Sequence, residues 1–114
     1  PPRSTLFPYT TLFRSATHAA KEIASLMVSM KGCDALIFTA GIGEQSAIIR
    51  QMIVEQLDFL GFSLDADKNI DGRIDVPILR INSDDDKQIY VILTDEQLEL
   101  ALSLEHTITI ETNN

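Results

Sequence analysis

Residues 34–46 read Asp34-Ala35-Leu36-Ile37-Phe38-Thr39-Ala40-Gly41-Ile42-Gly43-Glu44-Gln45-Ser46. The run from Ala35 to Phe38 is short and apolar, which favours a buried strand over a helix. Two glycines follow it, and Ser46 opens a segment whose apolar residues recur with helical periodicity. This order predicts a strand, a glycine turn and a helix N-terminus. Backbone N–H groups and the helix dipole at such a turn suit a phosphate or the edge of a nucleotide.

The glycine spacing alone does not identify the ligand, because any strand–helix connection can need a glycine. A Walker-type loop requires Gly-Lys-Ser/Thr at the helix start, and this sequence has no lysine there. A dinucleotide loop needs a small residue at Ser46 and an acidic residue after a second strand. Asp65 and Asp67 lie near the required distance, but Gly61–Leu64 is a thin strand. The Walker interpretation is therefore excluded, and the dinucleotide interpretation stays open.

Residues 34–46 closely resemble the adenosine-binding loop of acetate kinases, which usually carries Asn where this chain has Gln45. The resemblance spans about Ala16 to Leu104 and continues through Ile48-Ile49-Arg50, Leu60-Gly61, Leu64-Asp65, Lys68-Asn69 and Thr94-Asp95-Glu96-Gln97-Leu98. It implies an α/β fold: part of a ribonuclease-H-like domain of the actin and hexokinase superfamily, with helices packed on a small sheet. It also implies the family's reaction, a reversible, Mg²⁺-dependent transfer of the γ-phosphoryl group of ATP to acetate.

The resemblance assigns binding of the adenine nucleotide, ATP or ADP, to one loop. The residues concerned are Gly41, Ile42, Gly43, Glu44 and Gln45. Gln45 keeps the amide of the usual Asn but reaches further, so an adenine contact at this position is expected to move.

Glu96 has both a structural and a functional interpretation. Thr94 to Gln97 has the form of a capping box that opens a last helix ending near Leu104. A carboxylate in the first turn of a helix stabilises it by about 0.3–1 kcal/mol. In acetate kinases the matching Glu of a Thr-Asn-Glu-Glu motif is a magnesium-site residue. Both neighbours of Glu96 differ from that motif, so the resemblance carries the Mg²⁺ role to Glu96 alone.

The resemblance covers only part of the family's machinery. The family's phosphate loop and its catalytic Arg and His have no counterpart in this sequence, and no motif places Lys21, Lys31 or Arg50 to replace them. We therefore expect no catalytic residue in this chain and no turnover by the chain alone. Acetate and propionate stay open as acceptors, because the acyl pocket belongs mainly to the part without a counterpart. The resemblance implies a homodimer when intact, and open sheet edges predict self-association of this chain.

Composition limits the possible partners. A chain of 114 residues with 45% hydrophobic residues suits one small globular domain. The net charge of −8 argues against nucleic acid or an anionic membrane as a partner. No segment approaches the roughly 18 apolar residues of a membrane span. The single cysteine, Cys33, cannot form an internal disulfide and suits a reducing cytoplasm.

Residues 1–15 differ from the rest of the chain. Acidic residues are absent, Thr-Leu-Phe occurs twice, and Pro2 and Pro8 are expected to interrupt any amphipathic helix. A transit peptide is one interpretation, since those segments are poor in acids. The string more closely resembles the translation of a sequencing adapter joined to a coding fragment. We therefore divide the chain into a non-native segment 1–15, a nucleotide-binding portion 16–106 and a polar tail 107–114.

Two amphipathic helices are expected before and after the glycine loop. The first covers residues 16–30, with Gly32 at the position just after its end. The second runs from Ser46, as N-cap, to Leu60, and Gly61 stops it. Its solvent-facing residues are expected to be Arg50, Gln51, Glu55 and Asp58. His18 is expected at the surface, and Cys33 is expected to be a small core residue.

Residues 67–75 offer a rival, non-enzymatic function as a small acidic Ca²⁺-binding or interaction module. They match the first nine positions of an EF-hand loop, but Ile78 stands where a bidentate Glu is required. A polar turn is the other interpretation, because Asp, Asn and Gly form turns for their own reasons. After it, the sequence predicts a strand at Val76–Ile81, and Pro77 implies either an edge position or a strand entrance. Residues 82–87 predict a hairpin-like turn and Gln88–Leu93 a strand covered on both faces.

Overall fold

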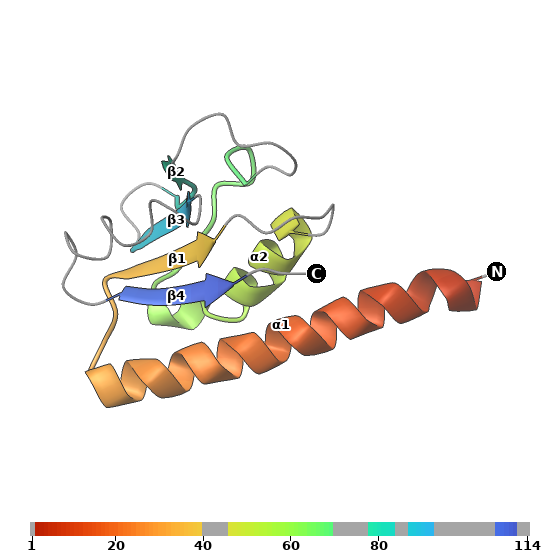
Figure 1. Ribbon diagram of the computed structural model, residues 1–114, viewed down its shortest axis with the longest axis horizontal. Coiled ribbons are helices and arrows are strands. Elements are labelled where there is room, and N and C mark those ends of the chain that lie inside the picture. Colours follow the sequence, from red (N-terminus) through yellow and green to blue (C-terminus); the bar gives the residue numbers. More distant parts are fainter. Residues whose placement is uncertain (1, 40–45, 70–77, 84–86, 93–106, 112–114) are drawn as a thin grey trace.

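The computed structural model describes residues 2–39, 46–69, 78–83, 87–92 and 107–111. Its elements are α1 (Pro2–Met30), β1 (Ala35–Thr39), α2 (Ser46–Glu55), the 3-10 helix η1 (Asp58–Leu60), β2 (Ile78–Arg80), β3 (Gln88–Ile92) and β4 (Thr107–Glu111). The strands form one mixed sheet with the order β2-β3-β1-β4 (Figure 1). The α/β class expected from the sequence is confirmed.

Strand β1 lies inside the sheet, with a parallel partner on each side. Ala35 faces Gln88 of β3 in one register and Thr107 of β4 in the other. Every residue of β1 is buried. A parallel strand that is covered on both faces needs apolar side chains at consecutive positions. This requirement explains why the sequence from Ala35 to Phe38 reads as a continuous apolar run.

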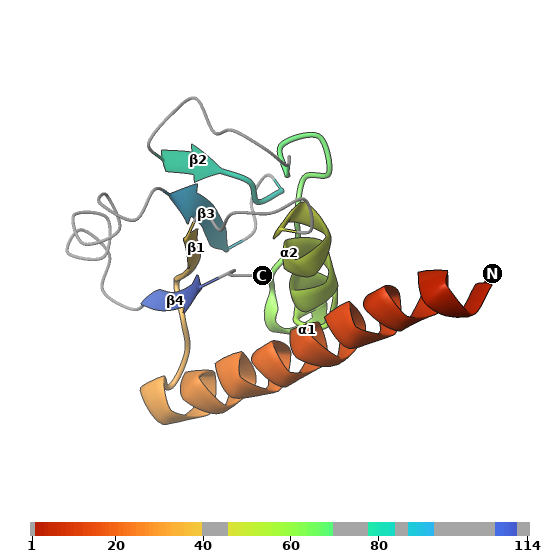
Figure 2. The same ribbon diagram turned by 45° about the vertical axis from the view of Figure 1, so that its right-hand side comes forward.

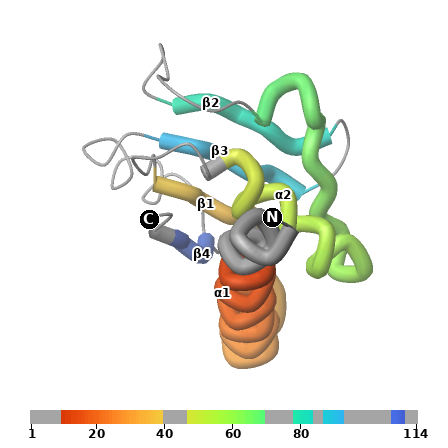
Figure 3. The backbone as a smooth tube through the Cα atoms, turned by 90° about the vertical axis from the view of Figure 1, so that its right-hand side faces the viewer, coloured from red at the N-terminus to blue at the C-terminus, as the bar shows by residue number. Residues whose placement is uncertain are grey.

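The main core lies between the sheet and the two helices. Helix α2 lies against one face of the sheet, and α1 runs alongside α2 (Figures 2 and 3). Part of the stripe predicted for α1 and most of the apolar stripe predicted for α2 supply this core, together with alternate residues of β1 and β3. Ala20, Ile23 and Met27 of α1 are buried as expected, whereas Val28, which was expected on the same stripe, is 80% exposed. The largest buried members include Leu36, Phe38, Ile53, Leu57, Phe62, Ile89 and Val91.

Helix α1 begins much earlier than expected. It runs without a break from Pro2 to Met30, so the expectation that Pro2 and Pro8 would interrupt a helix in residues 1–15 is wrong. Proline is tolerated in a first helical turn, and Pro8 removes one backbone hydrogen bond because it has no N–H group. Leu12 packs against the core and Ala16 is fully buried, so side-chain packing supports the helix on both sides of residue 15. The N-terminal part of α1 projects beyond the sheet (Figure 1).

Helix α1 ends in a Schellman motif shifted by one residue from the prediction. The N–H of Gly32 donates to the carbonyl of Met27 at 2.8 Å, and that of Lys31 to Val28 at 3.3 Å. This pattern makes Lys31 the residue just after the helix, with a left-handed φ of 60°. Gly32 follows with φ 124°, a conformation that residues with side chains rarely adopt. The predicted glycine is therefore required, but one position later than expected.

Helix α2 ends at Glu55 rather than at Leu60. The chain then tightens, with Gln56 N–H donating to Ile53 at 3.1 Å and Leu57 N–H to Val54 at 2.9 Å. These bonds span three residues, as is common in a last turn, and η1 continues the tightened form. Gly61, with φ 97°, stops the segment as predicted.

The C-terminal half confirms two predicted strands and adds a third. β2 lies at the edge of the sheet and pairs with β3 in antiparallel fashion. Asn82, assigned from the sequence to a polar turn, is buried, and its Oδ1 accepts the backbone N–H of Ile89 at 3.1 Å. Residues 107–111 were expected to be a polar tail. They form β4 instead, because Ile108 packs into the core beside β1.

Candidate functional site

The residues predicted to bind nucleotide and metal lie outside the described part of the chain. This holds for the loop Gly41, Ile42, Gly43, Glu44 and Gln45 and for Glu96. The structure does describe both ends of the loop, which are Thr39 at the end of β1 and Ser46 at the start of α2. The site is therefore built from what holds these two ends.

The strand that leads into the loop is fixed by its neighbours. Thr39 is buried, and its Oγ1 donates a hydrogen bond to the backbone carbonyl of Ile110 in β4 at 3.4 Å. Because β3 and β4 both run parallel to β1, three strands end at the same edge of the sheet. In open α/β sheets, ligands bind outside the carboxyl ends of the strands. The predicted loop leaves β1 at this edge.

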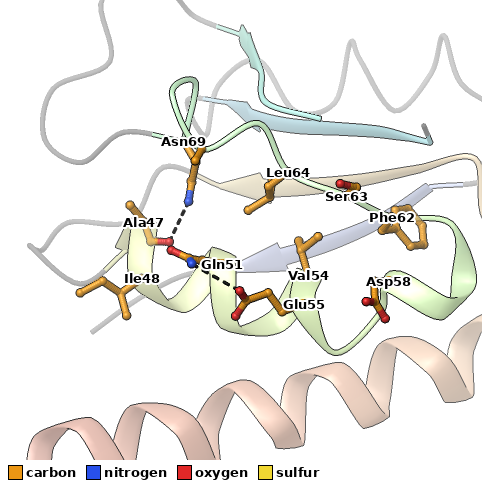
Figure 4. Close-up of a pocket in the computed structure, with 11 residues that line it drawn as sticks. Ala47, Ile48, Gln51, Val54, Glu55, Asp58, Phe62, Ser63, Leu64 and Asn69 are labelled. Carbon is orange, nitrogen blue, oxygen red and sulfur yellow. Dashed lines mark hydrogen bonds between the residues drawn. The ribbon is translucent and has the colours of Figure 1, made fainter. Parts of the chain in front are cut away.

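The helix that follows the loop is held by side-chain hydrogen bonds in its first turns. Arg50 Nε donates to Asn69 Oδ1 at 2.7 Å, and Asn69 Nδ2 donates to the backbone carbonyl of Ala47 at 2.9 Å. We call these three residues the Asn69 bracket. Figure 4 shows the Asn69 amide reaching across to the start of α2. The bracket ties the beginning of α2 to a segment about twenty residues away along the chain.

Asn69 is presented to α2 by a compact turn. The backbone N–H of Asp67 donates to Asp65 Oδ1 at 2.9 Å, and the N–H groups of Lys68 and Asn69 both donate to the Asp65 carbonyl at 3.1 Å. A side-chain acceptor two residues before its donor is an Asx-turn, which Asp forms readily. The polar-turn interpretation of residues 67–75 is thus confirmed for residues 67–69, the described part of that range.

This geometry opposes the calcium interpretation. Asn69, the third position of the EF-hand match, directs its oxygen at the Arg50 guanidinium, and a second cation on that oxygen would be repelled. Across the described ranges, no group of three or more His, Cys, Asp or Glu side chains is arranged to hold a metal ion. Residues 70–75 of the match and the acidic run 84–86 lie outside those ranges. The calcium module finds no support.

The buried position of Arg50 corrects the predicted solvent-facing side of α2. Arg50 is only 2% exposed, whereas Gln51, Glu55 and Asp58 are exposed as expected. The signal was present in the spacing: Arg50 precedes Ile53 and Leu57 by three and seven positions, which places all three on one helical stripe. A buried charged residue needs a hydrogen-bond acceptor, and the partly buried Asn69 supplies one. Sequence reasoning missed both residues.

A cavity of about 390 Å³ lies between α2 and residues 62–69 (Figure 4). Apolar walls come from Ile48, Val54, Phe62 and Leu64. Among the described residues that line it, Glu55 and Asp58 are the charged ones, and none is Lys, Arg or His. A cavity with two carboxylates and no cation disfavours a phosphate, so we do not assign the nucleotide to it.

The remaining candidate side chains have structural roles. Cys33 is buried, its Sγ donates to the carbonyl of Ala35 at 3.0 Å, and burial raises the pKa of its thiol. A raised pKa keeps the thiol protonated and unreactive, as predicted for a core residue. His18 is exposed and lies 3.1 Å from Glu22 one turn along α1, as expected for a surface histidine. Among the described helices, none is long and apolar enough to cross a membrane.

Comparison with known proteins identifies relatives of this chain. A model of the acetokinase family matches residues 11–102. An acetate kinase of Dichelobacter nodosus is 46% identical over 85 residues, 72% of this chain and 21% of the relative. Acetate kinase 1 of Listeria monocytogenes is 41% identical over 83 residues, 73% of this chain and 20% of the relative. The chain thus spans about a fifth of the length of these curated relatives.

Solved structures agree with this relationship. A propionate kinase of Francisella tularensis superposes with a TM-score of 0.56 at 39% identity, covering 82% of this chain and 23% of that one. An acetate kinase of Entamoeba histolytica superposes with a TM-score of 0.60 at 32% identity, covering 73% of this chain and 21% of that one. With the family match over most of the sequence, these likenesses lead to one conclusion: the chain belongs to the acetokinase family.

Proposed function

We propose that this chain forms the nucleotide side of an acyl kinase that transfers the γ-phosphoryl group of ATP to a short carboxylic acid. The observation that carries the proposal is the position of the loop's two ends. The loop leaves β1 at the carboxyl edge of three parallel strands and enters the N-terminus of α2, a combination that suits an anionic ligand. We assign the nucleotide contact to Gly41, Ile42, Gly43, Glu44 and Gln45.

Glu96 is proposed as a Mg²⁺-site residue. Strand β3 runs parallel to β1 and ends at Ile92, so the chain leaves both strands at one edge of the sheet. Glu96 follows Ile92 closely in the sequence, which supports a position near the glycine loop. A carboxylate oxygen is the ligand type that Mg²⁺ prefers, and the ion would neutralise charge on the transferred phosphoryl group.

Direct binding tests this assignment. Titrating the ¹⁵N-labelled chain with Mg-ADP should shift the amide resonances of residues 41–45, while MgCl₂ alone should leave them unchanged. Titrations with adenosine and with pyrophosphate separate the base contact from the phosphate contact. A Gly43→Val variant should lose the response, whereas Ser29→Val, on the exposed side of α1, should keep it. Absence of any shift at residues 41–45 with Mg-ADP would remove the binding claim.

We propose that the chain alone does not catalyse phosphoryl transfer. Phosphoryl transfer depends on cations placed around the transferred group. Lys21 and Lys31 are exposed at α1, and Arg50 is buried and bonded to Asn69, so none of the three is placed for that work. The relatives, named acetate or propionate kinases, are much longer, because the matched part of this chain covers only 21% of one and 23% of another. Acetyl phosphate or propionyl phosphate formed by the purified chain would refute this proposal, and either product would also identify the acceptor.

Association between copies and a cytoplasmic location complete the proposal. Strands β2 and β4 are the two edges of the described sheet, and unpaired edges promote association. The lone cysteine fits a reducing compartment. Sedimentation velocity across a range of concentrations should show a concentration-dependent shift from monomer to larger species. A single monomeric species at every concentration would contradict the association.

A further inference from the structure

We propose that Asn69 and Arg50 are positioning residues: the Asn69 bracket sets the place of the α2 N-terminus and so determines how well the glycine loop binds its nucleotide. This inference rests on the proposed function. It goes beyond that function by giving a role to two residues outside the loop, which no nucleotide contact requires.

Both halves of the Asn69 amide are used. Its oxygen accepts from Arg50 at 2.7 Å, and its nitrogen donates to the carbonyl of Ala47 at 2.9 Å. A carboxamide is suited to this pair of contacts, because it carries an acceptor and donors on one rigid plane. Aspartate would keep the acceptor and lose the donor, and an aliphatic residue would lose both. The bracket is therefore specific to the amide side chain.

The bracket acts on the first turns of α2 and not on the helix as a whole. Ala47 lies next to Ser46, where the helix begins, and Arg50 lies one turn further. Arg50 is 2% exposed, and hydrogen bonds from a buried guanidinium are stronger than neutral ones. A shift of the helix start by about 1 Å would take both contacts beyond good hydrogen-bond distance.

The loop is thus anchored independently at its two ends. At the entry, Thr39 donates to Ile110 and β1 is paired on both sides. At the exit, the bracket holds Ala47 against the 65–69 turn. Holding a loop's ends in the bound arrangement improves affinity, because less ordering remains to be done on binding. Loss of the exit anchor is expected to weaken binding while the sheet stays intact.

Three variants test the bracket. Asn69→Ala removes both contacts, and Asn69→Asp removes only the donor to Ala47. Gln56→Ala is the matched control, because the Gln56 side-chain amide, just past the C-terminal end of α2, donates to the Met52 carbonyl at 3.2 Å, away from the loop. Circular dichroism first identifies a temperature at which each variant is folded. We expect both Asn69 variants to bind Mg-ADP about tenfold more weakly or worse and the control to change less than about twofold.

Each outcome decides the matter. Unchanged affinity in Asn69→Ala, or equal weakening in Gln56→Ala, overturns the positioning role. Wild-type affinity in Asn69→Asp overturns the need for the contact to Ala47.

Should the wild-type chain bind no nucleotide, the proposed function fails separately. In that case, amide hydrogen exchange tests whether the bracket holds the start of α2. The backbone N–H groups to follow are those of Arg50 and Gln51, because a helix that starts at Ser46 makes its first internal hydrogen bonds with them. Faster exchange there in Asn69→Ala, but not in Gln56→Ala, supports it, and unchanged exchange overturns it.

Discussion

The two ends of α2 are held by different kinds of interaction. At the N-terminal end, the buried Arg50 side chain donates to the partly buried Asn69 side chain. At the C-terminal end, tightened backbone bonds and the apolar side chains of Leu57 and Phe62 close the helix. Apolar burial tolerates small shifts, whereas hydrogen bonds of fixed geometry do not. The directional contacts occur at the end that adjoins the predicted nucleotide loop.

The largest effect is expected at the C-terminal end. Phe62 is fully buried, so Phe62→Ala should lower the free energy of unfolding by about 3–5 kcal/mol in urea titration. Phe59→Ala is the matched control, because Phe59 is 76% exposed in η1 and its loss should cost less than about 0.5 kcal/mol. If the two variants lost similar amounts of unfolding free energy, apolar burial would not be what stabilises the C-terminal end of α2.

Removing the Arg50 guanidinium should destabilise the N-terminal end of α2. Arg50→Met leaves the Asn69 oxygen without its charged donor and is expected to cost about 1.5–3 kcal/mol of unfolding free energy. Arg14→Met, at an exposed position of α1, should cost less than about 0.5 kcal/mol. An Arg50→Met variant as stable as the wild type would mean that polar contacts do not stabilise this end.

Backbone conformation sharpens the comparison further. Gly61 has φ 97°, and an added Cβ would lie 3.4 Å from the flexible end of Lys87, which can move away. Gly61→Ala should therefore cost roughly 1–2 kcal/mol from the left-handed backbone alone. Gly32→Ala meets no atom within 4 Å, so its cost should be of the same size. A clearly larger cost at Gly61 would show that the Lys87 side chain, whose ammonium lies 5.4 Å from the Phe62 ring centre, is fixed in place.

The smallest effect has the opposite sign. Lys31 holds a φ of 60°, which glycine adopts without strain, so Lys31→Gly is expected to stabilise the chain by less than about 1 kcal/mol. Lys21→Gly, at an exposed position inside α1, is the control and should destabilise by about 1 kcal/mol. A loss of stability in Lys31→Gly, measured as a lower urea midpoint, would contradict relief of strain at this helix end.

Sequence reasoning predicted the parts of the fold that depend on local pattern. The apolar run of β1, the stripes of α1 and α2 and the stop at Gly61 each leave a signature within a few residues. The buried Arg50 was missed because its partner Asn69 lies far along the chain, in a segment that resembles a calcium loop. Strand β4 was missed because its alternation of Thr and Ile resembles a tail until β1 is placed beside it. The loop 41–45 and Glu96 remain predictions.

The central position of β1 has a consequence for how the chain acquires its structure. β1 is the first strand in the sequence, yet both of its partners, β3 and β4, come later, the last beginning at Thr107. While the chain is being synthesised, β1 therefore emerges with both hydrogen-bonding edges unsatisfied. Pairings between distant segments form slowly, and an apolar strand that waits for them is exposed to aggregation. Expression at low temperature or with a chaperone should favour a soluble product.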